Sequence, residues 1–479
     1  MSAAADVSPR TSWLDARRAV LLATALSAVV HLLMAGSLPL ILTPDSGEYV
    51  RGALALRGGG GPWVELNRTP VYPLLLAATF AFFGVGAGGI LIVQNLLAVG
   101  SCALVTWTAT RVASPRAALA AGVLYAIEPW SLVLTNYALT ETVTVFFVVL
   151  AVALALGLRR ATIPAAVAIG AALAAACLTR PAIQSMVPFF ALGWLLGLPV
   201  AARRRALLGG VLAASVLACC APWLAYNASR GVRGLAGISG ATFWYGAAIA
   251  GLVDPDAAPD EATRAAALRD LLPGAGDADV HRVIFAFDAY RSLEQSERFG
   301  AWARASIARR PIAYVTAAWD ALRWQLNAGV AGRPPMYDEL PFFAERLTWD
   351  THDPPRAVAP NFQNPGPLPK PWAFSVAWHG GVLQTYARTV AHAPLHGIPQ
   401  VPLLLCALAA CVLAAWRRAW PLALVLLGTI VFLLAHAMLL LPVARHAIPV
   451  TTVWYVALAW LIGGRASGAP LSSSSPPSA

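Results

Sequence analysis

Ten apolar runs, each close to the length that crosses a lipid bilayer, constrain the fold of this chain more than any other feature. A transmembrane helix needs about 20 largely apolar residues. The runs cover residues 18–42, 89–110, 117–134, 142–158, 163–179, 183–200, 206–226, 394–416, 419–441 and 447–464. Only 12% of the 479 residues are charged and 58% are hydrophobic, whereas soluble domains carry about 25% charged residues. The sequence therefore predicts an all-α polytopic integral membrane protein with about ten transmembrane helices.

Arginine clusters between the runs orient the chain. They comprise Arg10, Arg17 and Arg18, then Arg111 and Arg116, Arg159 and Arg160, Arg203 to Arg205, and Arg417 and Arg418. All of them fall on one side of the membrane if the short Pro- and Gly-rich run 70–87 does not cross. Because arginine-rich short loops stay cytoplasmic, we expect both termini inside and 70–87 to be interfacial or re-entrant. The formal charge of +11 then reflects membrane orientation and not nucleic-acid binding.

The same reading divides the chain into five parts. These are a cytoplasmic N-terminal tail (1–17), an N-terminal transmembrane module expected to hold the site (18–226, with a first external loop at 43–88), a large external loop region (227–393), C-terminal transmembrane helices (394–464) and a disordered cytoplasmic tail (465–479). In the large loop, 258–271 and 279–309 have helical patterns, and 311–327 is expected to lie along the membrane surface. Ser46 to Arg57 can form a short amphipathic helix, with Val50, Ala53 and Leu54 toward lipid.

Two carboxylates stand at the outer ends of different spans. Asp45, with Glu48 three residues later, follows the first span, and Glu141 follows the third. By the predicted orientation they face the same side at the same depth. Such carboxylates can activate a hydroxyl as general base or hold a divalent cation. The alternative is a polar cap on each span.

Three arginines break the cytoplasmic trend and lie at the predicted outer boundary. They are Arg68 in NRTP, Arg180 in TRP and Arg445 in ARHAIP. Outward arginines beside carboxylates suit the phosphate of a lipid-linked substrate. The alternative for each is a side chain that reaches to lipid headgroups.

In chain order these segments resemble the GT-C superfamily of polyprenyl-phosphate-dependent glycosyltransferases, nearest to the protein mannosyltransferase and lipid A aminoarabinose transferase branch. The matching segments are PDSGEY at 44–49, NRTPVYP at 67–73, NYALTETV at 136–143, PWLAYNASRG at 222–231 followed by Ser239, Gly240 and Tyr245, and ARHAIP at 444–449. The likeness covers about residues 15–465. His446 replaces the usual tyrosine. Ser46 replaces the second acid of the protein mannosyltransferases, and this second difference argues against a protein acceptor.

The resemblance implies inverting transfer of a sugar from a polyprenyl phosphate to a lipid, glycan or protein acceptor outside the cytoplasmic membrane. It implies Asp45 as the base and Glu141 as its supporting acid. The expected substrate-binding residues are Arg68, Arg180, Arg445, Glu48 and Tyr49. No nucleotide-binding fingerprint is present, as expected if a lipid phosphate leaves. A divalent cation is the one cofactor left open. Basic residues that are almost all arginine, with abundant alanine, indicate a bacterial inner membrane with the site facing the periplasm or exterior.

A polytopic transporter or lipid-linked-sugar flippase is the alternative function. Transporters place charges near the membrane midplane and often contain inverted repeats. Here the predicted spans are almost free of charge, with Glu128, His31 and His436 as exceptions. We interpret both histidines as structural, and Glu128 as lying near the outer end, where it could line the cavity.

Overall fold

The computed structural model describes residues 9–37, 40, 44–58, 68–157, 161–271, 277–290, 292–326, 400–440 and 447–464, and it confirms an all-α fold for them. In chain order the helices are α1 (Pro9–Ser37), α2 (Pro44–Gly58), α3 (Val71–Phe83), α4 (Ala87–Val112), α5 (Pro115–Ala126), α6 (Pro129–Leu134), α7 (Glu141–Gly157), α8 (Ile163–Thr179), η1 (Pro181–Met186), α9 (Val187–Gly197), α10 (Ala202–Ser229), α11 (Ser239–Ile249), η2 (Pro255–Ala257), α12 (Glu261–Asp270), α13 (Asp277–Ala286), α14 (Leu293–Arg309), α15 (Pro311–Gln325), α18 (Gln400–Trp416), α19 (Trp420–Met438) and α20 (Ile448–Gly463). The expected disordered tail at 465–479 lies outside these residues.

Helix length supports fewer crossings than predicted. Within the described ranges, four helices are long and apolar enough to span a membrane: α1, α4, α10 and α19. The shorter apolar helices, of 10–17 residues, are α3, α7, α8, η1 with α9, α18 and α20. At 1.5 Å per residue a 17-residue helix reaches only about 25 Å, against a hydrocarbon core of about 30 Å. Each of the ten predicted runs contains a helix, but ten crossings are not confirmed.

One predicted span is broken. The run 117–134 forms two helices, α5 and α6, which are separated by Ile127 and Glu128. Proline at the first position of α6 has no N–H to continue the hydrogen bonding of α5. The carboxylate of Glu128 instead accepts a bond of 2.5 Å from the backbone N–H of Ser131. Glu128 therefore caps a short helix.

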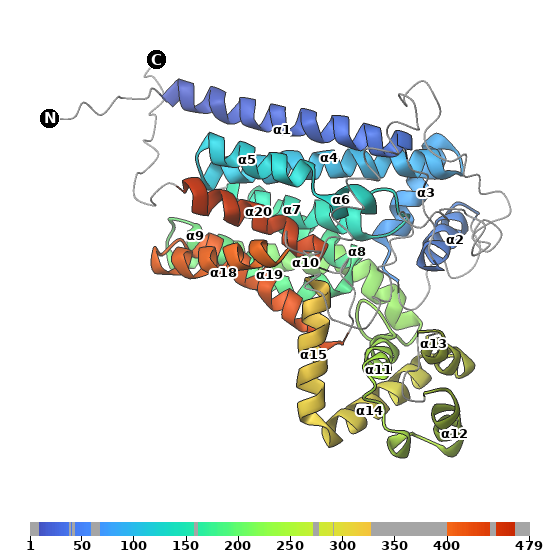
Figure 1. Cartoon of the computed structure of the whole chain (residues 1–479). Coiled ribbons are helices and arrows are strands. Elements are labelled where there is room, and N and C mark those ends of the chain that lie inside the picture. The colour runs from blue at the N-terminus through green and yellow to red at the C-terminus, as the bar shows by residue number, and fades with distance from the viewer. Residues whose placement is uncertain are drawn as a thin grey trace.

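The bundle has two distinct ends (Figure 1). α4 lies at its centre, packed against α1, α5, α7 and α20. The start of α1 lies at the same end as the bridge between Ala113 and Gly464, while α2 and α3 lie at the other end. α3, the predicted interfacial segment, has 13 residues, about 20 Å of helix. It is too short to cross the bilayer alone.

The apolar face of α2 turns toward protein, which corrects the expectation that it meets lipid. Val50 and Ala53 are fully buried in the main hydrophobic core, and Leu54 packs against it. The reason is that α2 lies along α3. This packing holds α2 against α3, the helix that follows Arg68.

Helices α11 to α14 form a separate group beside the bundle, on the side where α2 lies (Figure 1). Their core contains Trp244, Phe299 and Trp302, packed with ring centroids 4.8–5.6 Å apart. α11 and α14 cross at Gly240 and Gly300, where a Cβ on Gly240 would lie 2.1 Å from the Ser296 carbonyl oxygen. The predicted single helix 279–309 is two helices, α13 and α14, separated by a turn.

α15 joins this group to the bundle and stands at a steep angle to α19 (Figure 1). The Tyr314 hydroxyl donates to the Met438 carbonyl at 2.8 Å. Ile312, Val315 and Trp319 are largely exposed, and their spacing places them on one face. An exposed apolar face of this kind is typical of a helix at a membrane surface. The location predicted for residues 311–327 stays a prediction.

Candidate active site

Arg68 is the centre of a cluster formed with the first turns of α2. Its Nη2 donates to Asp45 at 2.7 Å, its Nε donates to Glu48, and its Nη1 donates to the Tyr49 hydroxyl at 3.2 Å. The guanidinium carbon also lies 4.8 Å from the centre of the Tyr49 ring. One planar cation thus uses three of its five N–H donors, one on each nitrogen, on three neighbouring side chains.

Local sequence explains this grouping. Asp45, Glu48 and Tyr49 have the i, i+3, i+4 spacing that places side chains on one face of a helix. Asp45 lies in the first turn of α2, where the helix dipole favours a negative charge. Pro70, two residues after Arg68, immediately precedes α3. The cluster therefore forms wherever α2 and the start of α3 meet.

A second ion pair forms between the start of α7 and the end of α8. Nη1 of Arg180 lies 3.3 Å from Oε1 of Glu141, and the two side chains are only 14% and 4% exposed. Glu141 is the first residue of α7 and Arg180 caps α8. The two helix ends alone would stabilise these charges less than an oppositely charged side chain does. Buried charges need paired, hydrogen-bonded surroundings, and Glu141 and Arg180 provide them for each other.

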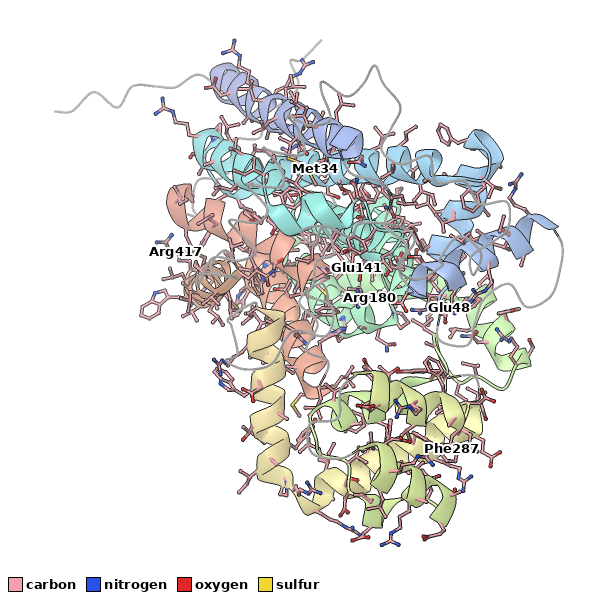
Figure 2. The ribbon with its side chains drawn as sticks, turned by 45° about the vertical axis from the view of Figure 1, so that its right-hand side comes forward. Met34, Glu48, Glu141, Arg180, Phe287 and Arg417 are labelled. Carbon is pink, nitrogen blue, oxygen red and sulfur yellow. The ribbon has the colours of Figure 1, made fainter. Side chains whose placement is uncertain are left out.

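The two pairs belong to one region. The Thr69 hydroxyl, next to Arg68, donates to the carbonyl of Thr179, next to Arg180, at 2.9 Å. Figure 2 shows Glu141 and Arg180 side by side with Glu48 across from them on α2. Burial raises the pKa of Tyr49, and Arg68, Asp45, Glu141 and Arg180 all act electrostatically on it. Tyr49 therefore lies within electrostatic range of both pairs.

Electrostatics keep Arg68 charged. Burial alone disfavours the charged guanidinium, but Asp45, Tyr49 and Glu48 together raise the pKa of Arg68 well above its ordinary value. A permanently charged, planar donor at one end of an apolar bundle can bind a phosphate. Asp45 at 36% and Glu48 at 27% are the more accessible carboxylates beside it.

Glu141 also lines a small cavity within the bundle. Ser101, Tyr125, Ser131 and Thr142 line it together with apolar residues. His436 on α19 is buried against Phe432, with ring centroids 4.3 Å apart, and Arg180 acts on it electrostatically. The interpretation of His436 as structural stays a prediction.

His31 has a structural role. Its Nδ1 pairs with Oδ1 of Asn95 at 3.0 Å, which links α1 to α4 inside the bundle. Arg445 and His446, predicted to join the site, lie outside the described residues. The structure thus brings together Asp45, Glu48, Tyr49 and Arg68, and beside them Glu141 and Arg180.

The described residues do not fit a divalent cation well. Among them, no three His, Cys, Asp or Glu side chains are arranged to hold a metal ion. A guanidinium lies where a cation between Asp45 and Glu48 would be.

Comparison with known proteins found a sequence-family model that matches part of the chain. Residues 67–226 match the family model of dolichyl-phosphate-mannose-protein mannosyltransferases, which confirms the predicted resemblance over those residues. The matched region contains Arg68, Glu141 and Arg180, whereas Asp45 precedes it. No curated protein matches the chain.

Several solved structures match the chain at low identity. The Saccharomyces cerevisiae O-mannosyltransferase Pmt1–Pmt2 complex bound to its sugar donor is 15% identical over 46% of this chain and 34% of its own, with a TM-score of 0.34. Archaeoglobus fulgidus oligosaccharyltransferase AglB with an inhibitory peptide and a dolichol-phosphate is 13% identical over 95% and 50%, with a TM-score of 0.47. ArnT from Cupriavidus metallidurans bound to undecaprenyl phosphate is 16% identical over 90% and 77%, with a TM-score of 0.37. The chain spans a third of the yeast protein and half of the archaeal protein.

Proposed function

We propose that this chain, which matches a mannosyltransferase family over residues 67–226, is a membrane glycosyltransferase that uses a polyprenyl-phosphate sugar donor. It transfers the sugar to an acceptor at the outer face of the cytoplasmic membrane, with inversion at the anomeric carbon. The observation that carries this proposal is the cluster of Arg68 with Asp45 and Glu48 beside the buried pair Glu141–Arg180. It combines cations for a phosphate with a carboxylate for a hydroxyl at one end of an apolar bundle.

In this mechanism Asp45 acts as the general base. The acceptor hydroxyl loses its proton to the carboxylate of Asp45 while its oxygen bonds to the anomeric carbon. The bond between that carbon and the phosphate oxygen breaks, and the electron pair leaves on the polyprenyl phosphate. Arg68 and Arg180 stabilise the negative charge that develops there. The same charges would bind the donor phosphate in the ground state.

Accessibility favours Asp45 over Glu141 as the base. The Asp45 side chain is 36% exposed, whereas Glu141 is 4% exposed. A base must come within hydrogen-bond reach of the acceptor hydroxyl. Glu141 is better suited to hold Arg180 in place, and its buried position explains why it would support the reaction without meeting the acceptor.

Replacing Arg68 with alanine should lower kcat/KM for the donor by about 10- to 150-fold. This range corresponds to the roughly 1.5–3 kcal/mol of a charge-assisted hydrogen bond. Transfer from a labelled prenyl-phosphate sugar by the purified protein measures it. Arg68→Lys keeps the charge but loses the donor fork, so an intermediate loss is expected.

Arg57→Ala serves as the matched control for this test. Arg57 is exposed in the last turn of the same helix, α2. Its variant should transfer sugar at the wild-type rate. If Arg57→Ala and Arg68→Ala lose equal activity while both stay folded, the assignment of the phosphate to Arg68 is wrong.

The proposed orientation places Arg57 outside and Arg204 inside. Both side chains are exposed in the structure. In a cysteine-free background, a membrane-impermeant thiol reagent added to intact cells should label Arg57→Cys and spare Arg204→Cys until the membrane is opened. The reverse pattern would overturn the predicted topology.

A further inference from the structure

Gln94 is buried in the bundle, and its side-chain amide forms hydrogen bonds through both its oxygen and its nitrogen. Its Oε1 accepts from the Tyr72 hydroxyl at 2.7 Å. Its Nε2 donates to the carbonyls of Thr135 at 2.8 Å and Tyr137 at 2.7 Å. Because only the amino end can donate to two carbonyls, these partners fix the orientation of the amide. Gln94 lies in α4, about 10 Å from its first residue.

The partners of Gln94 lead to both halves of the site. Tyr72 lies in α3, four residues after Arg68, and its ring packs edge-on against Tyr49 at 5.0 Å. Tyr49 in turn accepts a hydrogen bond from Arg68. Two side chains, those of Tyr72 and Tyr49, thus separate Gln94 from Arg68.

Toward the other half, Gln94 holds the segment that precedes Glu141. Thr135 and Tyr137 lie between α6 and α7, where the backbone is not helical. Non-helical carbonyls inside a membrane bundle need donors from elsewhere in the protein. Gln94 supplies two such bonds within six residues of Glu141. It therefore holds the segment that leads into α7.

We propose that Gln94 is a positioning residue that fixes the spacing between the Asp45–Arg68 and Glu141–Arg180 pairs. This inference rests on the proposed function, because it assigns those pairs to one reaction. A polar amide is costly in an apolar helix unless its bonds are made. Gln94 makes three, all to segments that carry the site. A misplacement of about 1 Å in such a site can cost about 100-fold in rate.

Asn95 provides a matched control on the same helix. It is also buried, and its amide bonds to the Leu91 carbonyl and to His31 on α1. Gln94→Met and Asn95→Leu each remove one buried amide at similar depth. Only the first removes contacts to Tyr72, Thr135 and Tyr137.

Two measurements on the full-length protein in nanodiscs test the proposal. Hydrogen–deuterium exchange should become faster at residues 135–140 in Gln94→Met and stay at the wild-type rate in Asn95→Leu. The kcat of sugar transfer should fall about 10- to 100-fold in Gln94→Met, with little change in the KM for the donor, while Asn95→Leu keeps the wild-type kcat. Gln94→Glu, which retains size and loses both N–H donors, gives the same comparison if the methionine variant does not fold.

The outcomes separate this inference from the proposed function. Wild-type exchange at 135–140 in the Gln94 variants, or faster exchange with wild-type kcat, overturns the positioning role. If the wild-type protein transfers no sugar, the proposed function fails, and the role of Gln94 in catalysis fails with it even where the exchange result holds. Equal losses of kcat in the Gln94 and Asn95 variants show a general effect of buried amides and overturn the inference.

Discussion

Replacing Asp45 with asparagine should lower the rate of sugar transfer by about 100- to 10,000-fold, which is the range for loss of a general base. Asparagine keeps the size of the side chain, and its carbonyl can still accept from Nη2 of Arg68, which lies 2.7 Å from Asp45. The change therefore removes proton acceptance while it keeps most of the local geometry. Single-turnover transfer with the purified variant, at saturating donor, measures the chemical step.

Glu48→Gln is the control for this prediction. Glu48 binds the same guanidinium through Nε of Arg68 and lies one turn further along α2. It should lose less activity, because the proposed mechanism gives it no proton to accept. Wild-type transfer by Asp45→Asn together with an inactive Glu48→Gln variant would mean that the base is Glu48.

Replacing Arg180 with alanine should destabilise the protein by about 3–5 kcal/mol, the usual cost of removing one member of a buried ion pair. Glu141, at 4% exposure, would keep its charge in a poorly solvated place after its guanidinium is removed. Equilibrium unfolding in mixed detergent micelles measures the change. Adding Glu141→Gln to the same chain should recover much of the loss, since the amide carries no charge to bury.

A surface pair gives the reference value. Arg298 and Asp260 lie 3.1 Å apart and are both more than a third exposed. Arg298→Ala should cost no more than about 1 kcal/mol. Similar losses for Arg298→Ala and Arg180→Ala would show that the Glu141–Arg180 pair is screened by solvent and is not the buried pair described above.

Part of the site follows from local sequence. The spacing of Asp45, Glu48 and Tyr49 places them on one helical face whatever the rest of the chain does. We expect Arg68 on the same side of the membrane as these three residues, because the segment that joins them is short. For Glu141 and Arg180, 39 residues apart, the sequence predicts only that both lie on the same side of the membrane. The sequence contained no sign that these two residues would be direct partners.

Gln94 illustrates where sequence reasoning stops. A glutamine in an apolar run indicates that some polar group must meet it, because an unbonded amide is costly there. The identity of that group depends on which side of α4 faces α3 and the turn before α7. Helix rotation of this kind results from many weak packing contacts that no single motif encodes.

The sequence by itself determined that this chain is helical and where most helices lie, since a backbone in lipid must satisfy its own hydrogen bonds. Proline alone did not determine where a helix ends: the run 117–134 is broken before Pro129, which lacks a backbone N–H, whereas Pro222 lies inside α10. Only the tertiary structure decided what covers each apolar face. Val50 and Ala53 meet α3 and the core rather than lipid, and their sequence could not distinguish the two, because lipid tails and protein interiors are equally apolar. Tertiary packing likewise selected the partners of Arg68, Glu141 and Gln94, because those contacts join segments whose relative placement is set by the whole bundle.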